Sequence, residues 1–552
     1  MSLPPGPKYL LHQFPSILAP PALVYVISYA ICKYRNIILP VWLVVVAAFL
    51  SLPVAFALQV QWYDFKNHMD ARAHDAVMAP PIEHKYPGSF DVLSAVFRTS
   101  EKGYLADLFF RWTLKYGHTF NFRVLFQNRM YTSEPEYIKT MLATDFPLYE
   151  KGPLVNEQLH TLLGTGVFNS DGKWKFHRSI TRPFFSKDRI SHFDIFDRHC
   201  DEALKKMDAR LREGYAVDWQ DLVSRFTMDS ATEFLFGKDH PADEFVQAFQ
   251  SALEETAIRG RYLQAWPLAE FWGDKVKRSM KAIDDFIDPI VADALRKKAQ
   301  GETDTGDSGE KDIADDETLL EYLIKQTDDK TILKDETLNI LLAGRDTTAC
   351  TLTFAVYKLA ERPDILRHLR KEVLATVGGA RRPTYDDIRN MKYLRAFINE
   401  TLRMYPPVPF DTRCSIGPTI WKAKDPSEKD FYIPARTRCL YSVFVMHRRT
   451  DLWGPDALKF DPDRFLDERM QKYLVRNPFI FLPFNGGPRI CLGQQFAYNE
   501  ASRPPRRAAA AGLLGLPGCE GGEKVWLRAH LTMYVKNGLW VKMGAVSEDE
   551  TA

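Results

Sequence analysis

One short segment near the carboxyl-terminal end of the chain constrains the fold more than any other feature. It carries the pattern F-x-x-G-x-R-x-C-x-G, formed by Phe484, Gly487, Arg489, Cys491 and Gly493. At average residue usage, five specified positions recur by chance with odds of about one in ten thousand. A cysteine of this kind is either a buried free thiol or a thiolate ligand. The flanking glycines and arginine favour the ligand.

The composition describes a globular protein with a large core. Its 552 residues are 45% hydrophobic and 26% charged, which excludes a disordered or collagen-like chain and a small disulfide scaffold. Lys and Arg number 73 against 71 Asp and Glu, so the net charge of +2 gives no reason to expect nucleic acid as a partner. The seven cysteines are scattered and odd in number, which is typical of reduced thiols.

A charge-free apolar stretch from Ile37 to Leu58 lies near the N-terminus. As a helix it is long enough to cross a hydrocarbon core about 30 Å thick, and the alternative is a buried core helix. An earlier apolar stretch, from about Ile17 to Ile31, is shorter and contains Pro20 and Pro21. It is a second span, a re-entrant piece or an interfacial segment. Basic residues flank both ends of the later stretch, so the positive-inside rule does not decide its orientation.

With the cysteine motif, the sequence resembles the cytochrome P-450 family of haem-thiolate monooxygenases. The resemblance implies that Cys491 is the axial thiolate ligand of the haem iron, stabilised by backbone N–H groups and by the helix that follows. Gly487 would permit a sharp turn, and Gly493 would let that helix approach the porphyrin. Arg489 would pair with a haem propionate, and Phe484 would shield the sulfur. An axial thiolate favours O–O cleavage.

A second match to the family lies in a long amphipathic pattern from about Lys334 to Ala360, which Pro363 ends. Residues 343–348 in its middle read Ala-Gly-Arg-Asp-Thr-Thr. These residues break helix preferences inside a predicted core helix, which indicates a functional site. In the family this helix crosses the distal haem face, where it opens locally for dioxygen, and Asp346 and Thr347 would relay protons. The alternative is a polar patch on a surface helix.

Two further motifs complete the resemblance around the haem. Trp174 and Arg178 match W-x-x-x-R and could both address a propionate, as could Arg413 by its position in the family pattern. The alternative for Trp174 and Arg178 is packing plus a solvated charge.

A third group of residues has an architectural role in the family. Glu400 and Arg403 form E-x-x-R, and Arg464 belongs to the segment Pro-Asp-Arg-Phe, which is similar to the family's P-E-R-F. Together these three residues would form a buried charge network that holds the cysteine loop.

The helix after the cysteine departs from the family pattern. Two prolines at 504–505 would each cost about 3 kcal/mol in a helix interior, so the helix is predicted to stop near Ser502. We interpret residues 503–522 as an out-of-frame segment from a gene-model error, or as real divergence with lost packing beside the haem. Beyond it, alternation from Leu531 to Met543 about Asn537-Gly538 predicts a β-hairpin.

The resemblance covers roughly Pro87 to Met543 and is strongest to fungal membrane-bound alkane and fatty-acid hydroxylases. It implies a mainly α-helical P-450 fold with small β-sheets over residues 76–552, behind a membrane anchor over residues 1–75. The implied reaction hydroxylates a lipophilic substrate (an alkane, a fatty acid or a polycyclic aromatic) with O₂. NADPH electrons would come from a separate flavoprotein reductase, because the sequence contains no recognisable flavin- or NADPH-binding module. In the family such reductases face the cytosol from the endoplasmic reticulum.

Two alternatives stay open. One is a haem-thiolate isomerase or peroxygenase on the same fold, which would not need the proton relay of Asp346 and Thr347. The other is a catalytically impaired membrane haem protein, because the helix is disrupted at 503–522.

Overall fold

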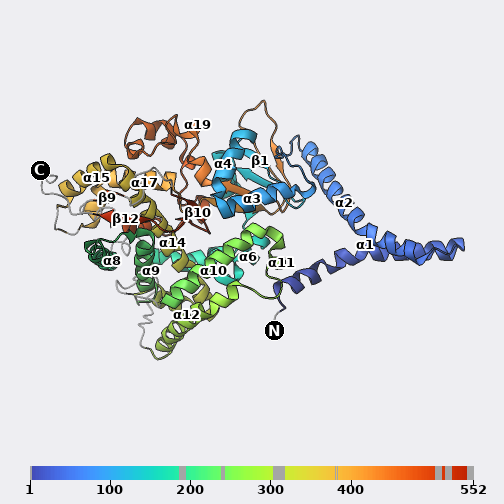
Figure 1. Ribbon diagram of the computed structural model, residues 1–552, viewed down its shortest axis with the longest axis horizontal. Helices are drawn as coiled ribbons and strands as arrows, with labels where there is room; N and C mark the ends of the chain where they lie inside the picture. Colours follow the sequence, from blue (N-terminus) through green and yellow to red (C-terminus); the bar gives the residue numbers. More distant parts are fainter. Residues whose placement is uncertain are drawn as a thin grey trace.

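The computed structural model describes residues 3–185, 194–237, 243–301, 317–378, 381, 383–503, 513–515 and 525–543. A large body is built mainly from helices, with four small sheets, and the first two helices extend away from it (Figure 1). This architecture confirms the predicted mainly α-helical fold with small β-sheets.

Helices α1 (Pro5–Arg35) and α2 (Val41–Ala73) form an antiparallel hairpin whose connection lies far from the body (Figure 1). Both are long and apolar enough to cross a membrane, and their most apolar windows are 0% buried. The predicted span therefore lies largely within α2, and its alternative as a buried core helix is wrong. The earlier stretch is part of an equally continuous helix, although Pro15, Pro20 and Pro21 lie inside it.

Both ends of this hairpin meet the body. At the start of α1, the backbone N–H of Gly6 donates to the carbonyl oxygen of Phe271 at 3.1 Å. A Cβ on Gly6 would lie 2.7 Å from the Cα of Phe271, so the two backbones approach too closely for a side chain. After α2, the N–H of Val77 donates to the carbonyl oxygen of Asp430 at 2.9 Å.

Helix α14 is the central helix of the body. The body contains α3 (Phe90–Lys102), α4 (Leu105–Tyr116), α5 (Pro135–Lys139), α6 (Pro153–Leu163), α7 (Trp174–Thr181), α8 (Asp194–Arg212), α9 (Trp219–Phe236), α10 (Asp243–Tyr262), α11 (Trp266–Ala269), α12 (Val276–Ala299), α13 (Leu319–Gln326), α14 (Lys330–Glu361), α15 (Pro363–Thr376), α16 (Tyr385–Asn390), α17 (Lys392–Met404), α18 (Val443–Met446), α19 (Thr450–Trp453) and α20 (Gln494–Ala501). The Asp329 side chain caps α14 by accepting from the N–H groups of Thr331 and Ile332. Buried residues occupy all faces of α14, so it is a core helix and not the surface helix with a polar patch of the alternative.

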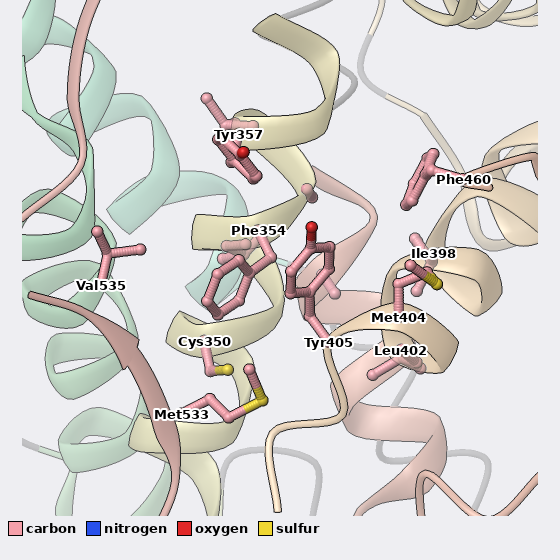
Figure 2. Packing of buried hydrophobic residues seen from close by; sticks show 14 of the residues in the cluster. Cys350, Phe354, Tyr357, Ile398, Leu402, Met404, Tyr405, Phe460, Met533 and Val535 are labelled. Atoms are coloured by element: carbon pink, nitrogen blue, oxygen red, sulfur yellow. The ribbon is translucent and has the colours of Figure 1, made fainter. Parts of the chain in front are cut away.

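Aromatic packing fixes α14 against α17. The rings of Phe354 and Tyr405 are stacked with centroids 4.4 Å apart, and Figure 2 shows them between the two helices. Cys350 and Met533 lie below this pair in the same cluster (Figure 2). Large buried aromatic rings contribute strongly to core stability, so the position of α14 relative to α17 is well defined.

Four small sheets complete the body. The largest has the strand order β1 (Thr119–Asn121), β2 (Arg129–Thr132), β8 (Arg438–Ser442), β5 (Phe410–Ser415), β3 (Tyr149–Glu150), and the others are β4 (Val217–Asp218) with β12 (Trp540–Met543) and β9 (Leu513–Gly515), β10 (Leu527–Ala529) with β11 (Met533–Val535), and β6 (Thr419–Trp421) with β7 (Phe431–Ile433). In the five-stranded sheet, β2 and β8 are parallel, and all other neighbours are antiparallel.

The end of the chain confirms part of the prediction. Helix α20 ends at Ala501, as the prolines require. Residues 504–512 and 516–522 of the predicted disrupted segment lie outside the described residues, so both interpretations of that segment stay predictions.

The predicted hairpin is half right. Asn537 and Gly538 have φ angles of 69° and 81°, as a tight turn requires. The two strands on either side of this turn, β11 and β12, do not pair with each other. Instead, β11 pairs with β10, and β12 pairs with β4 and β9.

Candidate active site

A cavity of about 640 Å³ lies between α14, the five-stranded sheet and the cysteine loop. Its lining is mainly apolar. Eight of the ten predicted site residues line it, namely Thr347, Cys491, Phe484, Arg489, Gly493, Trp174, Arg178 and Arg413. Asp346 and Gly487 lie outside the lining.

The loop that carries Cys491 is closed by backbone contacts. The N–H of Cys491 donates to the carbonyl oxygen of Phe484 at 2.9 Å. Gly487 has a φ of 67°, and a Cβ there would lie only 1.7 Å from the carbonyl oxygen of Leu142. Glycine is therefore required at this turn. A Cβ on Gly493 would meet protein atoms only at 3.9 Å or more, so the protein alone does not demand glycine there.

Cys491 is exposed to the cavity that it lines. Burial among the surrounding residues raises the pKa of Cys491, while the N–H of Gly493 and the guanidinium of Arg178 act to lower it. Arg178 also donates to the carbonyl oxygen of Ile490 at 2.7 Å, which ties α7 to the cysteine loop. Arg178 and the N–H of Gly493 alone therefore do not make Cys491 a thiolate. Coordination to a metal deprotonates a thiol outright, so the thiolate would form when the sulfur binds iron.

Two guanidinium groups that line the cavity, one buried and one half-buried, have unused donors. Arg413 is 2% exposed, and its Nη1 lies 3.1 Å from Asp411 Oδ2. Arg489 donates through Nη2 to the carbonyl oxygen of Ser170 at 3.0 Å and lies 5.0 Å from the Trp174 ring centroid. Within the described residues, Arg413 Nε and Arg489 Nη1 have no hydrogen-bond partner. Unpaired buried donors of this kind fit an anionic ligand.

The sequence motifs missed Lys151, which joins this cationic wall. Burial lowers the pKa of Lys151 to about 8; Asp411 opposes this shift, and Arg413 and Arg489 add to it. Burial alone would raise the pKa of Asp411, but Arg413 and Lys151 hold it at about 2. Lys151 belongs to no recognised motif, and only the three-dimensional fold brings it to the cavity. The excess of positive charge fits the two propionates of a haem.

On α14, Thr347 lines the cavity, and its hydroxyl donates to the carbonyl oxygen of Ala343 at 2.7 Å. Asp346 lies 3.0 Å from Nη1 of Arg345. Burial raises the pKa of Asp346, and Arg345 acts against that shift. The helix is continuous through Gly344. The local opening that the resemblance implies stays a prediction.

The predicted buried charge network is present. Glu400 and Arg403 are both 0% exposed, with Oε2 and Nε 2.6 Å apart, and Arg464 Nε lies 3.8 Å from Glu400 Oε1. Arg403 Nη1 donates to the carbonyl oxygen of His447 at 2.6 Å. His447 in turn accepts from the N–H of Leu482 at 3.0 Å, so the network reaches the start of the cysteine loop.

Comparison with known proteins agrees with this geometry. The family model described as Cytochrome P-450 matches residues 87–502. The chain is 39% identical to Cytochrome P-450 monooxygenase himC of Aspergillus japonicus over 399 residues, which cover 70% of this chain and 69% of that protein. It is 37% identical to Cytochrome P-450 52-E3 of Starmerella bombicola over 395 residues, which cover 67% and 73%. The chain belongs to the cytochrome P-450 family, whose members hold haem through a cysteine thiolate.

Proposed function

We propose that this protein is a haem-thiolate monooxygenase that hydroxylates a lipophilic substrate. The observation that carries the proposal is that Cys491 and Thr347 face one largely apolar cavity from opposite elements, the cysteine loop and α14. One oxygen atom of O₂ enters a C–H bond, and the other leaves as water after the uptake of two electrons and two protons. Isomerase and peroxygenase activities are less well supported, because the relatives are named monooxygenases.

Each residue of the site has a role in this proposal. Cys491 binds the haem iron, Phe484 covers the sulfur, and Gly487 and Gly493 give the loop and helix their close approach. Haem so ligated supplies the activation of O₂. The set that holds the propionates consists of Trp174, Arg178, Arg413 and Arg489, together with Lys151. This assignment is supported by the unpaired donors of Arg413 and Arg489.

Two neighbouring residues of α14, Thr347 and Asp346, deliver protons to the cavity. Thr347 holds a proton at Oγ1 on the cavity wall. Asp346, which is ion-paired with Arg345, exchanges protons with the outside after leaving that pair. Burial raises the pKa of Asp346, which favours uptake of a proton by a carboxyl group.

The proposal includes the cellular setting. Residues 1–75 anchor the protein in the endoplasmic reticulum membrane, and residues 76–552 form the catalytic domain in the cytosol. The electrons come from a separate NADPH-dependent flavoprotein reductase that docks near the cysteine loop. The two apolar helices support this arrangement.

The test uses the haem-loaded full chain with a purified reductase, NADPH and isotopically labelled O₂. Alkanes, fatty acids and polycyclic aromatics are supplied separately. We expect substrate-dependent NADPH consumption and a hydroxylated product that carries the label, and neither with Cys491→Ser. A product whose oxygen comes from water, or an isomer formed without O₂, would contradict the proposal.

A further inference from the structure

Two arginines outside the predicted site residues lie side by side on the cavity wall, Arg129 buried and Arg438 half-buried. Arg129 on β2 and Arg438 on β8 are register partners in the parallel strand pair, and both line the cavity. Register partners on adjacent strands point to the same face of a sheet. The two guanidinium groups are therefore directed into the same region of the cavity.

This pair is separate from the residues proposed to hold the haem. Arg438 is the register partner of Cys414 on β5, whereas Arg413 is the partner of Cys439. Successive residues of a strand point to opposite faces, so Arg413 lies on the face opposite to Arg438. The hydrogen bond from Arg438 Nε to Thr412 Oγ1, at 3.2 Å, agrees with this alternation.

Neither arginine has a carboxylate partner in the part of the chain that the structure describes. Arg129 is 3% exposed and donates through Nη2 to the neutral Gln264 Oε1 at 2.7 Å, and its Nε has no hydrogen-bond partner there. The buried Arg259, by contrast, lies 2.7 Å from Glu270 Oε2. Burial, together with Arg438, lowers the pKa of Arg129 to about 9. Asp411, whose charge also acts on Arg438, is already paired with Arg413. A buried cation beside a second, half-buried one is costly unless an anion completes the site.

We infer that Arg129 and Arg438 form a carboxylate-binding subsite, so that the substrate is a lipophilic acid rather than an uncharged hydrocarbon. A carboxylate has two oxygens that accept from adjacent guanidinium groups. The rest of the cavity is mainly apolar, and Phe109 and Phe122 beside β1 suit the hydrocarbon part of such an acid. The inference rests on the proposed function, because it names the substrate class of the same cavity.

Gln264 is a positioning residue for this subsite. It lies in the short turn Leu263–Ala265 that follows α10, and its side-chain oxygen accepts from Arg129. The turn is itself held by Gln158, whose Nε2 donates to the carbonyl oxygen of Leu263 at 2.9 Å. The guanidinium of Arg129 is thus oriented before any ligand arrives.

The test compares hexadecanoic acid with its methyl ester on the haem-loaded full chain, by calorimetry and by the substrate-induced Soret shift. The ester has the same chain without the charge. We expect the acid to bind about ten times more tightly or better, as a charge-assisted contact predicts. Equal affinity of acid and ester in the unmodified protein would overturn the inference without need of any variant.

Variants then locate the subsite. Arg129→Gln and Arg438→Gln should each abolish the preference for the acid, and Arg129→Lys should restore part of it. Arg436→Gln is the matched control, because Arg436 lies nearby but its side chain is 63% exposed and paired with Glu150. Loss of haem from Arg129→Gln, or an unchanged preference in it, would overturn the inference.

The two proposals fail differently. If the protein binds the acid through Arg129 but does not oxidise it with the reductase, the proposed monooxygenase function is wrong and the subsite stands. If it oxidises hydrocarbons and methyl esters as well as acids, the function stands and the subsite is wrong.

Discussion

At the scale of single residues, Gly487 is the position where the backbone leaves least freedom. Its φ of 67° and the carbonyl oxygen of Leu142 both exclude a side chain. We expect Gly487→Ala to lower the free energy of unfolding by about 2–3 kcal/mol through backbone strain and displacement of that carbonyl. Urea unfolding monitored by circular dichroism measures the change.

Gly172→Ala is the control for this substitution, because a Cβ there meets nothing within 4 Å. It should change stability by no more than about 0.5 kcal/mol. Equal effects of the two substitutions would show that the turn does not need glycine.

The second prediction for a single residue concerns Thr347. Removal of its hydroxyl leaves Cys491 untouched, so Thr347→Ala should keep the haem spectrum and lose the coupling of NADPH consumption to product. We expect the fraction of electrons recovered as product to fall about tenfold or more, within the range of a lost proton-transfer group. Thr347→Ser should retain most of the coupling.

Thr353→Ala is a matched control on the same helix. Its hydroxyl also donates four residues back, to Ala349 at 2.7 Å, but it does not line the cavity. Normal coupling in Thr347→Ala, or equal uncoupling in both variants, would contradict the assigned role.

At the scale of elements, the long helices follow directly from the sequence. The predicted core helix from about Lys334 to Ala360 is α14, and the end of α20 follows from proline, because both depend on neighbours along the chain. The five-stranded sheet does not follow: its strands are two to six residues long, and β2 pairs with β8 some 300 residues away. The same limit explains the mispredicted pairing about Asn537-Gly538, where the turn is local but the strand partners are not.

The hairpin of α1 and α2 yields a prediction about topology. Both of its ends contact the body, through Gly6 and Val77, and its connection is at the far end (Figure 1). If the body is cytosolic, the connection between Arg35 and Val41 is lumenal. An N-glycosylation acceptor in a long insert after Ile38 should therefore be modified in microsomes.

The same insert placed in the linker at Pro80 should stay unmodified, because that linker is on the side of the body. An unmodified insert at Ile38 together with a modified one at Pro80 would reverse the proposed orientation. Failure of α2 to cross the membrane would leave both inserts unmodified.

At the scale of the whole molecule, one buried histidine makes stability depend on pH. Nε2 of His447 accepts from Leu482, so its Nδ1 carries the proton that is shared with the carbonyl oxygen of Arg403 at 3.1 Å. Burial, followed by the charge of Arg403, lowers the pKa of His447 well below its ordinary value. The imidazole is therefore neutral in the folded protein.

The unfolded chain binds a proton at this position below about pH 6.5, whereas the folded chain does not. Stability is thus fully present above that pH and falls below it, by up to about 1.4 kcal/mol per pH unit for this one group. Urea unfolding at pH 7.5, 6.5 and 5.5 measures the slope. His447→Gln should be less stable at pH 7.5 and should show a shallower slope, and a slope equal to that of the unmodified protein would contradict the assignment.

The site itself could be predicted from the sequence only where a motif spans a few residues. Cys491, Arg489 and Thr347 belong to such motifs and do line the cavity. Lys151 and the pair Arg129 and Arg438 reach it from separate strands and loops, and their significance comes from the charges that the fold brings together there. Such an arrangement in space is not encoded in local spacing.

The central claim is that the sulfur of Cys491 binds the haem iron as a thiolate, and the spectrum of the reduced full-length protein under carbon monoxide tests it most directly. A strongly red-shifted Soret band is predicted for the unmodified protein, and its loss for Cys491→Ser. Cys350→Ser, which alters a buried thiol on α14, should retain the band. A Soret band at the unshifted position of a haem with a neutral ligand, or a red-shifted band that survives in Cys491→Ser, would contradict the account.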